Sequence, residues 1–368
     1  MLLLHPEVDI HLGRLVKNYN FIQSKVGAAK VMAVVKANAY GHGVVQVSKS
    51  LTEAGIYGFC VSLVDEIREL IRGDIQSPIL HLGRISSDEL DVYESGQVRC
   101  TINSTEDLKT LEDHGHKYSI RIIAHLKIDT GMGRLGVLYK DLERMLDKLS
   151  ESQHIEIEGV YSHFSTAEEK DTEYRDWQLK RFKDVISRVK KKLPQVEYFH
   201  MANSAAVLTF PEAHFNMVRP GISLYGVTPH DEPHNYLLPV MKMKAPVALI
   251  KEFNRGESVG YNRQYITDQN EKIAIIQAGY ADGIPVEYSN MGEVEIEGNK
   301  YPIVGKVSMD LVAIRCRNMD IKTGQEAIFW GSDDRDLRLE ALAEKFEKIP
   351  YEFLIGVTKR VKRNYIHE

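Results

Sequence analysis

The chain has 368 residues, more than one ordinary domain usually contains, and 43% of them are hydrophobic, enough to bury a large core. Its 47 basic and 52 acidic side chains leave a net charge of −5, which gives no support to a nucleic-acid partner or a membrane surface. No stretch approaches the roughly 20 apolar residues that a membrane helix needs, and the opening MLLLHPEVDI lacks the basic and apolar regions of a secretion signal.

Strand-like and helix-like stretches alternate through the first two thirds of the chain, beginning with a helical stretch at His11–Val26. Eight β-rich runs follow, at Val31–Val35, Gly58–Val61, Pro78–Leu82, Val98–Ile102, Ile120–Ile128, Ile157–Ser162, Val196–Met201 and Asn216–Arg219. Segments with helical spacing separate them, among them Gly43–Ala54, Thr105–His114, Lys140–Ser150 and Glu173–Lys192. This alternation predicts parallel βαβ units, and eight units predict a closed (β/α)8 TIM-like barrel; a doubly wound open sheet is the structural alternative.

The texture changes at Pro229–Pro239, a stretch rich in Pro, His and Asp that is typical of a linker. Six short alternating runs follow, at Pro246–Lys251, Ile273–Ala278, Gly292–Ile296, Pro302–Val307, Leu311–Cys316 and Glu326–Trp330. One helix is predicted at Leu337–Phe346. We therefore expect an α/β chain with a barrel domain at residues 1–232 and a C-terminal, mainly β domain at residues 233–368.

The three cysteines, Cys60, Cys100 and Cys316, are odd in number, far apart in the chain and set in strand-like contexts. None of them forms a metal-ligand pair, and the sequence predicts no metal site. We expect them to be core thiols of a protein in the reducing cytoplasm.

The first β-rich run leads into a lysine, Lys36, within the segment Ala33–Gly43 (AVVKANAYGHG). Barrel enzymes carry out their chemistry at the C-terminal ends of the strands. Burial at this end lowers a lysine's pKa and makes the amine a nucleophile or a base, as a Schiff base to an aldehyde cofactor requires. Taken alone, Lys36 has a simpler interpretation as a surface lysine just beyond a strand.

Polar and cationic residues recur at the ends of the later strands, in the segments Lys127–Arg134, Tyr161–Phe164, His200–Ser204 and Val218–Ile222. In a barrel these ends converge on one cavity, although a single histidine such as His163 or His200 is more often a hydrogen-bonded core residue. The turns at Ser204 and at Gly221–Ile222 follow strands seven and eight, where barrels commonly bind a phosphate through backbone N–H groups.

A phosphate site together with a strand-end lysine predicts pyridoxal phosphate as the cofactor. Arg219 would then face the pyridine nitrogen of that cofactor. An arginine cannot accept a proton or give up its charge, so it would keep the nitrogen unprotonated and weaken the ring as an electron sink. Such a site favours plain proton exchange over decarboxylation or transamination.

These segments resemble those of the alanine racemases, and the resemblance covers nearly the whole chain. The segment Ala33–Gly43 is similar to the family's lysine signature without a departure. Later barrel motifs follow in order at Lys127–Gly136, Tyr161–Ser165, His200–Ala206 and Val218–Gly226. In the second domain the similar segments are Val259–Tyr261, Gly279–Gly283, Val304–Asp310 and Ile349–Glu352.

The resemblance implies a role for each matching residue. Lys36 would be the Schiff-base lysine and one catalytic base, and Tyr261, reaching in from the partner subunit, would be the other. Arg219 would contact the pyridine nitrogen. The other cofactor-binding residues would be Tyr40, His163, Asn203, Ser204, Gly221, Ile222 and Tyr351. His163 would also lie against Tyr261, tied to Arg219, and would modulate its basicity.

The substrate-binding residues implied by the resemblance are Arg134, Met309 and Tyr280, the first two for the carboxylate and the last at the entrance. Lys127 is a candidate for a carbamylated lysine that positions Arg134. The chain departs from the family at Asn262, where glycine is common, and at Ser308, where cysteine or another small residue is usual. Neither departure removes a catalytic group.

The implied function is an isomerase that interconverts L-alanine and D-alanine by proton exchange between two bases on opposite faces of Cα. It would be a homodimer with shared active sites that supplies D-alanine for peptidoglycan. One alternative, a non-catalytic pyridoxal phosphate carrier, would resemble the first domain only. A basic amino-acid decarboxylase would pair the pyridine nitrogen with a carboxylate. The third alternative is a racemase of broader specificity, for serine or lysine.

Overall fold

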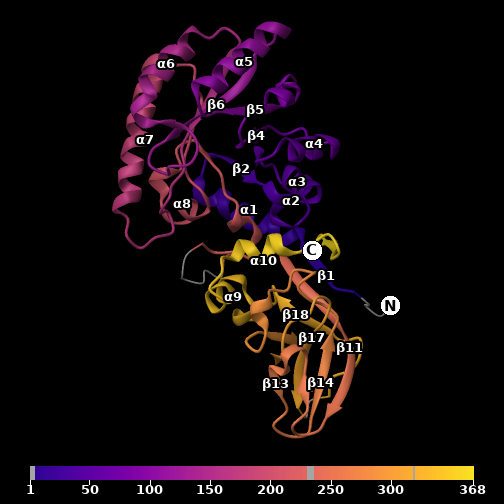
Figure 1. Ribbon diagram of the computed structural model, residues 1–368. Helices are drawn as coiled ribbons and strands as arrows, with labels where there is room; N and C mark the ends of the chain where they lie inside the picture. Colours follow the sequence, from indigo (N-terminus) through magenta and orange to yellow (C-terminus); the bar gives the residue numbers. More distant parts are fainter. Residues whose placement is uncertain (1–4, 230–235, 318–319) are drawn as a thin grey trace.

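The computed structural model describes residues 5–229, 236–317 and 320–368. Figure 1 shows a helix-covered barrel above a β-rich domain. Eight strands, each parallel to its neighbours, form the barrel in the order β5-β4-β3-β2-β10-β9-β8-β6, and a pairing between β5 and β6 closes it. Their bounds are β2 (Lys30–Val34), β3 (Gly58–Val61), β4 (Ile79–His81), β5 (Val98–Ile102), β6 (Ile122–Asp129), β8 (Ile155–Tyr161), β9 (Tyr198–His200) and β10 (Met217–Val218). The predicted eight-stranded barrel is confirmed, and the open-sheet alternative is excluded.

Helices cover the outside of the barrel, with an apolar stripe toward the strands. They are α1 (Leu12–Val26), α3 (Val44–Glu53), α4 (Val64–Arg72), α5 (Thr105–Tyr118), α6 (Leu142–Glu151), α7 (Glu173–Lys192) and α8 (Ser204–Thr209). In α6 the buried residues Leu142, Met145, Leu146 and Leu149 recur at the spacing of one helical face. The side chain of Ser104 caps α5 by accepting a hydrogen bond from the Asp107 N–H.

The second domain is mainly β, as predicted. Its strands are β11 (Met241–Phe253), β14 (Glu271–Ile276), β15 (Glu293–Ile296), β16 (Asn299–Val304), β17 (Val312–Arg317) and β18 (Glu326–Trp330). Pairings in the order β14-β17-β16-β15-β18-β11, with β11 also on β14, bring this sheet round on itself. Two short strands, β12 (Ser258–Val259) and β13 (Tyr265–Ile266), form a separate ladder. The helices α9 (Leu339–Lys345) and α10 (Pro350–Gly356) follow, and α10 lies on the side toward the barrel (Figure 1).

The first described strand, β1 (Glu7–His11), joins the sheet of the second domain rather than the barrel. It pairs antiparallel with β11 and parallel with β19 (Lys362–Ile366), and Lys244 Nζ lies 2.8 Å from a carboxylate oxygen of Asp9. The sequence pattern did not predict β1, because five residues run directly into α1 and their partners lie over two hundred residues away. The predicted boundary at 232/233 and most of the linker lie outside the described residues, so the domain limits stay a prediction.

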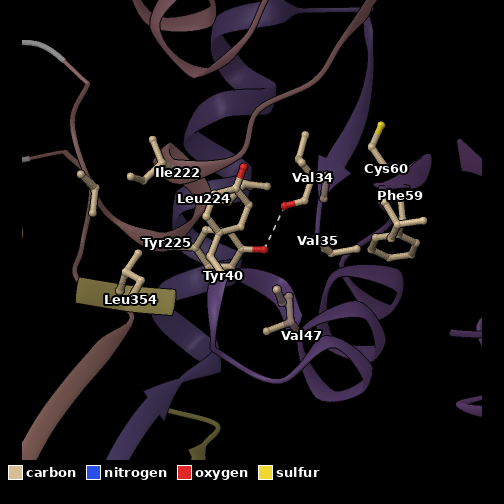
Figure 2. Packing of buried hydrophobic residues seen from close by; sticks show 14 of the residues in the cluster. Val34, Val35, Tyr40, Val47, Phe59, Cys60, Ile222, Leu224, Tyr225 and Leu354 are labelled. Carbon is tan, nitrogen blue, oxygen red and sulfur yellow. Dashed lines mark hydrogen bonds between the residues drawn. The ribbon is translucent and has the colours of Figure 1, made fainter. Parts of the chain in front are cut away.

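Close packing joins the start of the barrel to its last turn (Figure 2). The Tyr225 hydroxyl donates a hydrogen bond to the Val34 carbonyl at 3.1 Å, and its ring centroid lies 5.0 Å from that of Tyr40. Leu354 of α10 belongs to the same buried cluster. The end of β2, which precedes Lys36, is therefore fixed from both domains. Among the described residues, no helix is long and apolar enough to cross a membrane.

Candidate active site

Lys36 opens a short turn, α2 (Lys36–Tyr40), with an unusual backbone. The four residues Ala37–Tyr40 have φ between 51° and 55°, the left-handed region that costs non-glycine residues roughly 1–2 kcal/mol each. Two contacts hold the turn in place. The Glu66 carboxylate accepts the Ala37 N–H at 2.5 Å, and Arg363 Nε donates to the Gly41 carbonyl at 2.7 Å. Lys36 therefore stands on a turn that contacts from the rest of the fold hold in place.

A cavity of about 380 Å³ lies at this end of the barrel. Eleven of the residues predicted for the site line it: Lys36, Tyr40, Lys127, Arg134, His163, Asn203, Ser204, Arg219, Gly221, Ile222 and Tyr351. Residues that are 315 positions apart in the chain thus meet around one space. The convergence that the strand-end pattern predicted is what the fold produces.

The cavity is strongly cationic. Lys36, Lys127, Arg134 and Arg219 all line it, whereas Glu168 is the one carboxylate among its described lining residues. Burial, followed by the charge of Arg134, lowers the pKa of Lys36. Burial and the neighbouring arginines lower the pKa of Lys127 to about 8. This donor set fits an anionic ligand, and the lowered pKa values favour the neutral form of both amines.

Arg219 lines the cavity, is buried and has three neighbours that fix it. Its guanidinium donates to Nδ1 of His200 and, at 2.7 Å, to the Ser162 carbonyl, and it lies 4.8 Å from the ring centroid of Tyr161. The predicted tie between Arg219 and His163 is not a hydrogen bond. The link is electrostatic: burial and then the charge of Arg219 hold the pKa of His163 well below its usual value.

The end of the cavity near Ser204 gathers hydrogen-bond donors. Ser204 Oγ accepts the N–H groups of Gly221 at 2.9 Å and Ser223 at 3.2 Å. A side chain on Gly221 would bring its Cβ within 2.6 Å of the Tyr40 hydroxyl, so only glycine fits there. The ring centroids of Tyr40 and Tyr351, which also line the cavity, lie 5.6 Å apart. Backbone N–H groups and hydroxyls in this arrangement suit a phosphate.

Three predicted site residues lie elsewhere. Tyr261, Tyr280 and Met309 are 66%, 45% and 51% exposed, and none of them lines the cavity of its own chain. Tyr261 lies in the turn between β12 and β13, and Figure 1 places β13 in the lower part of the second domain, well away from α2 in the barrel. One chain therefore brings together the predicted cofactor residues but not the second predicted base.

The cavity also has lining residues that the sequence did not single out for a role: Val34, Ser62, Leu82, Gly83, Leu135, Tyr161 and Glu168. Ser62 follows β3 directly, and Leu82 and Gly83 follow β4, so the strand-end rule would have found them. Glu168 lies in a loop beyond β8, where no pattern marked it. Burial, with Glu169 nearby, raises the pKa of the Glu168 carboxyl.

The fold and this site define a (β/α)8-barrel enzyme with a partly buried lysine in a cationic cavity. A family model described as "Alanine racemase, N-terminal domain" matches residues 10–229, and one described as "Alanine racemase, C-terminal domain" matches residues 240–365. The chain belongs to the alanine racemase family. Because both domains match, the barrel-only carrier alternative loses its basis.

Individual relatives agree over nearly their full lengths. "Alanine racemase 2" of Caldanaerobacter subterraneus is 37% identical over 98% of this chain and 94% of its own. The crystal structure of the Streptomyces lavendulae alanine racemase superposes with a TM-score of 0.94 at 29% identity, covering 99% of this chain and 98% of that one. The Bartonella henselae alanine racemase, solved with covalently bound pyridoxal phosphate, has a TM-score of 0.89 at 31% identity, covering 98% and 99%.

Proposed function

We propose that this chain is a pyridoxal-phosphate-dependent racemase that interconverts L-alanine and D-alanine and supplies D-alanine for peptidoglycan. The observation that carries the proposal is the cationic cavity at the end of β2, where Lys36 meets the donors near Ser204 and the guanidinium of Arg219. The family membership and the relatives with the same domain pair support it.

The residues present fit the cofactor. Ser204, Gly221, Ile222, Tyr40 and Tyr351 would hold the phosphate, and the surrounding cations would balance its charge. When bound, pyridoxal phosphate supplies an aldehyde that takes up amines and a ring that withdraws electrons from the substrate Cα.

Arg219 would face the ring nitrogen of the cofactor. It can donate a hydrogen bond to that nitrogen but cannot protonate it, because a guanidinium does not give up its proton. Electron withdrawal by the ring stays moderate as a result, which favours returning a proton to Cα over losing a carboxylate.

Proton exchange needs one base on each face of Cα. Lys36 would act on one face, since burial and the charge of Arg134 lower its pKa and raise the share of neutral amine. Tyr261 of the partner subunit would act on the other face, with His163 against it. Arg134, positioned by Lys127, and Met309 of the partner subunit would bind the substrate carboxylate, and Tyr280 would line the entrance.

A homodimer with shared sites is part of this proposal, because Tyr261 does not line the cavity of its own chain. The second domain exposes large apolar or aromatic side chains at Tyr261, Tyr280, Met291, Met309, Leu311 and Ile349. A two-fold dimer would cover such residues and carry each Tyr261 into the barrel of the other chain. We also propose a cytoplasmic enzyme, which the three free and buried cysteines support.

The test is a racemisation assay on the purified chain with added pyridoxal phosphate. L-alanine, L-serine and L-lysine are each incubated, and the D-enantiomer is measured by chiral chromatography. The proposal expects D-alanine to form far faster than D-serine or D-lysine. It also expects the Lys36→Ala variant to lose racemase activity on all three amino acids. Faster racemisation of serine or lysine would favour the broader racemase, and loss of CO2 from the substrate would contradict the proposal.

A further inference from the structure

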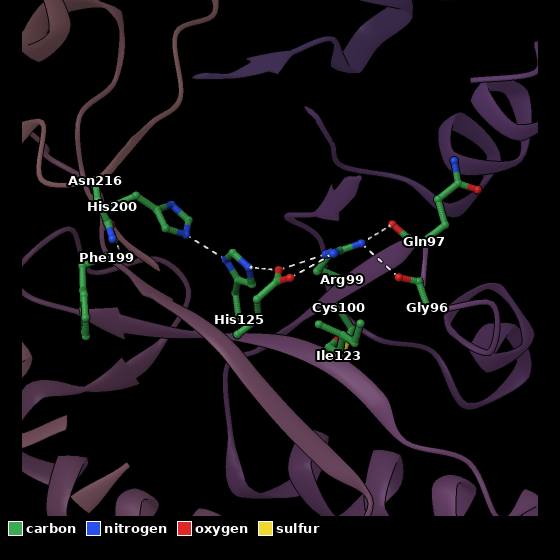
Figure 3. Close-up of polar contacts among 10 residues, drawn as sticks. Gly96, Gln97, Arg99, Cys100, Ile123, His125, Phe199, His200 and Asn216 are labelled. Carbon is green, nitrogen blue, oxygen red and sulfur yellow. Dashed lines mark hydrogen bonds and ion pairs between the residues drawn. The ribbon is translucent and has the colours of Figure 1, made fainter. Parts of the chain in front are cut away.

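A line of hydrogen bonds runs from Arg219 through the inside of the barrel to the ion pair between Glu158 and Arg99. Figure 3 shows the part of this line from His200 to Arg99. Arg219 contacts Nδ1 of His200, and Nε2 of His200 lies 2.8 Å from Nδ1 of His125. Nε2 of His125 lies 3.1 Å from a Glu158 oxygen, and Arg99 holds both oxygens of that carboxylate at 2.9 Å.

We call this line of hydrogen bonds from Arg219 to Arg99 the relay. The four residues that follow Arg219 in it come from four strands of the barrel. His200 ends β9, His125 lies on β6, Glu158 on β8 and Arg99 on β5. Both imidazoles are buried, whereas the Arg99 and Glu158 side chains are 13% and 16% exposed.

The position of the inner imidazole depends on a neighbouring glycine. A Cβ at Gly159 would fall 2.6 Å from the His125 ring, so the absence of a side chain there gives the imidazole its room. The relay is therefore built into the packing of the barrel core.

The chemistry of the two ends gives the relay a single direction. An arginine only donates and a carboxylate only accepts. Arg219 therefore requires a lone pair on Nδ1 of His200, which places the proton on Nε2. That proton points at Nδ1 of His125, whose own proton must then lie on Nε2, facing Glu158.

The lowered pKa values of both imidazoles agree with this direction. Burial lowers the pKa of His125, and burial together with Arg219 holds the pKa of His200 well below its usual value. Burial alone would raise the pKa of Glu158, but the hydrogen bonds from His125 and Arg99 outweigh it and hold the pKa at about 2.

We propose that Glu158 is a positioning residue for the cofactor-facing Arg219, because its carboxylate fixes the tautomers of His125 and His200 so that Arg219 always meets a lone pair. The inference rests on the proposed function only in taking Arg219 as the partner of the pyridine nitrogen. An amide in place of the carboxylate could donate to His125 as well as accept from it, so the direction of the relay would be set from the Arg219 end alone and the reverse tautomers would compete.

The experiment uses the full chain with pyridoxal phosphate bound and with ¹⁵N-labelled histidine rings, whose NMR shifts report which nitrogen carries the proton. His125→Asn and His200→Asn variants assign the signals. The wild type is expected to show both imidazoles neutral and protonated at Nε2 alone. E158Q is expected to show a mixture of tautomers at both, with kcat about tenfold lower and KM for alanine little changed.

Two controls separate a positioning role from a merely structural one. R99Q removes the ion pair but leaves an acceptor-only carboxylate, so the tautomers are expected to stay as in the wild type. E112Q removes a comparable carboxylate on α5, which binds His154 at 2.9 Å and has a pKa of about 2, and is also expected to leave them unchanged.

A proton on Nδ1 of His200 in the wild type would overturn the proposal, as would a charged imidazole there. An E158Q spectrum identical to that of the wild type would also overturn it, and so would an R99Q spectrum that shows the same mixture of tautomers as E158Q. If E158Q does not fold, the wild-type and R99Q spectra still test the proposal, because both report the tautomers with the Glu158 carboxylate in place. If the chain shows the expected tautomers but no racemase activity, the proposed function is contradicted and the role of Glu158 in fixing the tautomers is still supported.

Discussion

The imidazole of His200 lies flat against the ring of Tyr161, with centroids 4.8 Å apart and planes 7° apart. The Tyr161 ring also lies within 4.8 Å of the Arg219 guanidinium and 5.5 Å of the Lys127 ammonium. Its hydroxyl is 3.0 Å from Oγ1 of Thr101. One buried aromatic ring thus supports both the relay and two of the cavity's cations.

We expect the ring of Tyr161 to matter more than its hydroxyl. Tyr161→Phe loses one hydrogen bond and is expected to lower the free energy of unfolding by about 1 kcal/mol. Tyr161→Leu loses the stacking and cation–π contacts as well, and is expected to cost about 3 kcal/mol and to weaken cofactor binding. Urea unfolding and a cofactor titration measure both effects. Equal losses in the two variants would refute the role of the ring.

Lys36 is expected to carry the cofactor. Borohydride reduction of the chain loaded with pyridoxal phosphate should fix the label, and peptide mass spectrometry should find it within the segment 33–43. Lys127, the other cavity lysine, is the internal comparison, because its pKa is also lowered by burial. A label on Lys127 in place of Lys36 would sink the assignment.

The buried Lys127 should leave a trace in the pH dependence of stability. Its pKa is about 8 in the folded chain against 10.5 as the reference. Between these values the unfolded chain binds more protons, so the free energy of unfolding contributed by Lys127 rises with pH over that window. Urea midpoints measured in buffer freed of bicarbonate, to prevent carbamylation, should show this rise. Lys127→Met should remove it, and an unchanged slope in that variant would speak against the shifted pKa.

Arg219→Glu should broaden the chemistry of the site. A carboxylate opposite the pyridine nitrogen would favour its protonation and strengthen electron withdrawal from Cα. We expect slower racemisation and a higher yield of pyruvate by transamination, measured by product chromatography. Arg219→Lys, which keeps the cation, should slow racemisation without raising pyruvate. A product profile in Arg219→Glu that matches the wild type would rule out this role.

The strand-end pattern was enough to predict which barrel segments line the cavity, because apolar runs and small-residue turns mark where barrel strands finish. The position of Lys36 followed from that pattern. The relay did not, because His125 and Glu158 meet only where the register between β6 and β8 shifts, beside His125. The role of Tyr261 came from the family resemblance alone, because no local pattern shows that an exposed loop residue completes another chain's cavity.

The central claim is that each active site combines Lys36 of one chain with Tyr261 of its partner, and subunit mixing tests it most directly. Lys36→Ala and Tyr261→Phe should each be nearly inactive alone. After dissociation and random reassociation of an equimolar mixture, about half the dimers are heterodimers with one intact site, so roughly a quarter of wild-type activity should return. If Tyr261 served its own chain's Lys36, every site would keep one lesion, and a mixture that stayed inactive after confirmed subunit exchange would contradict the account.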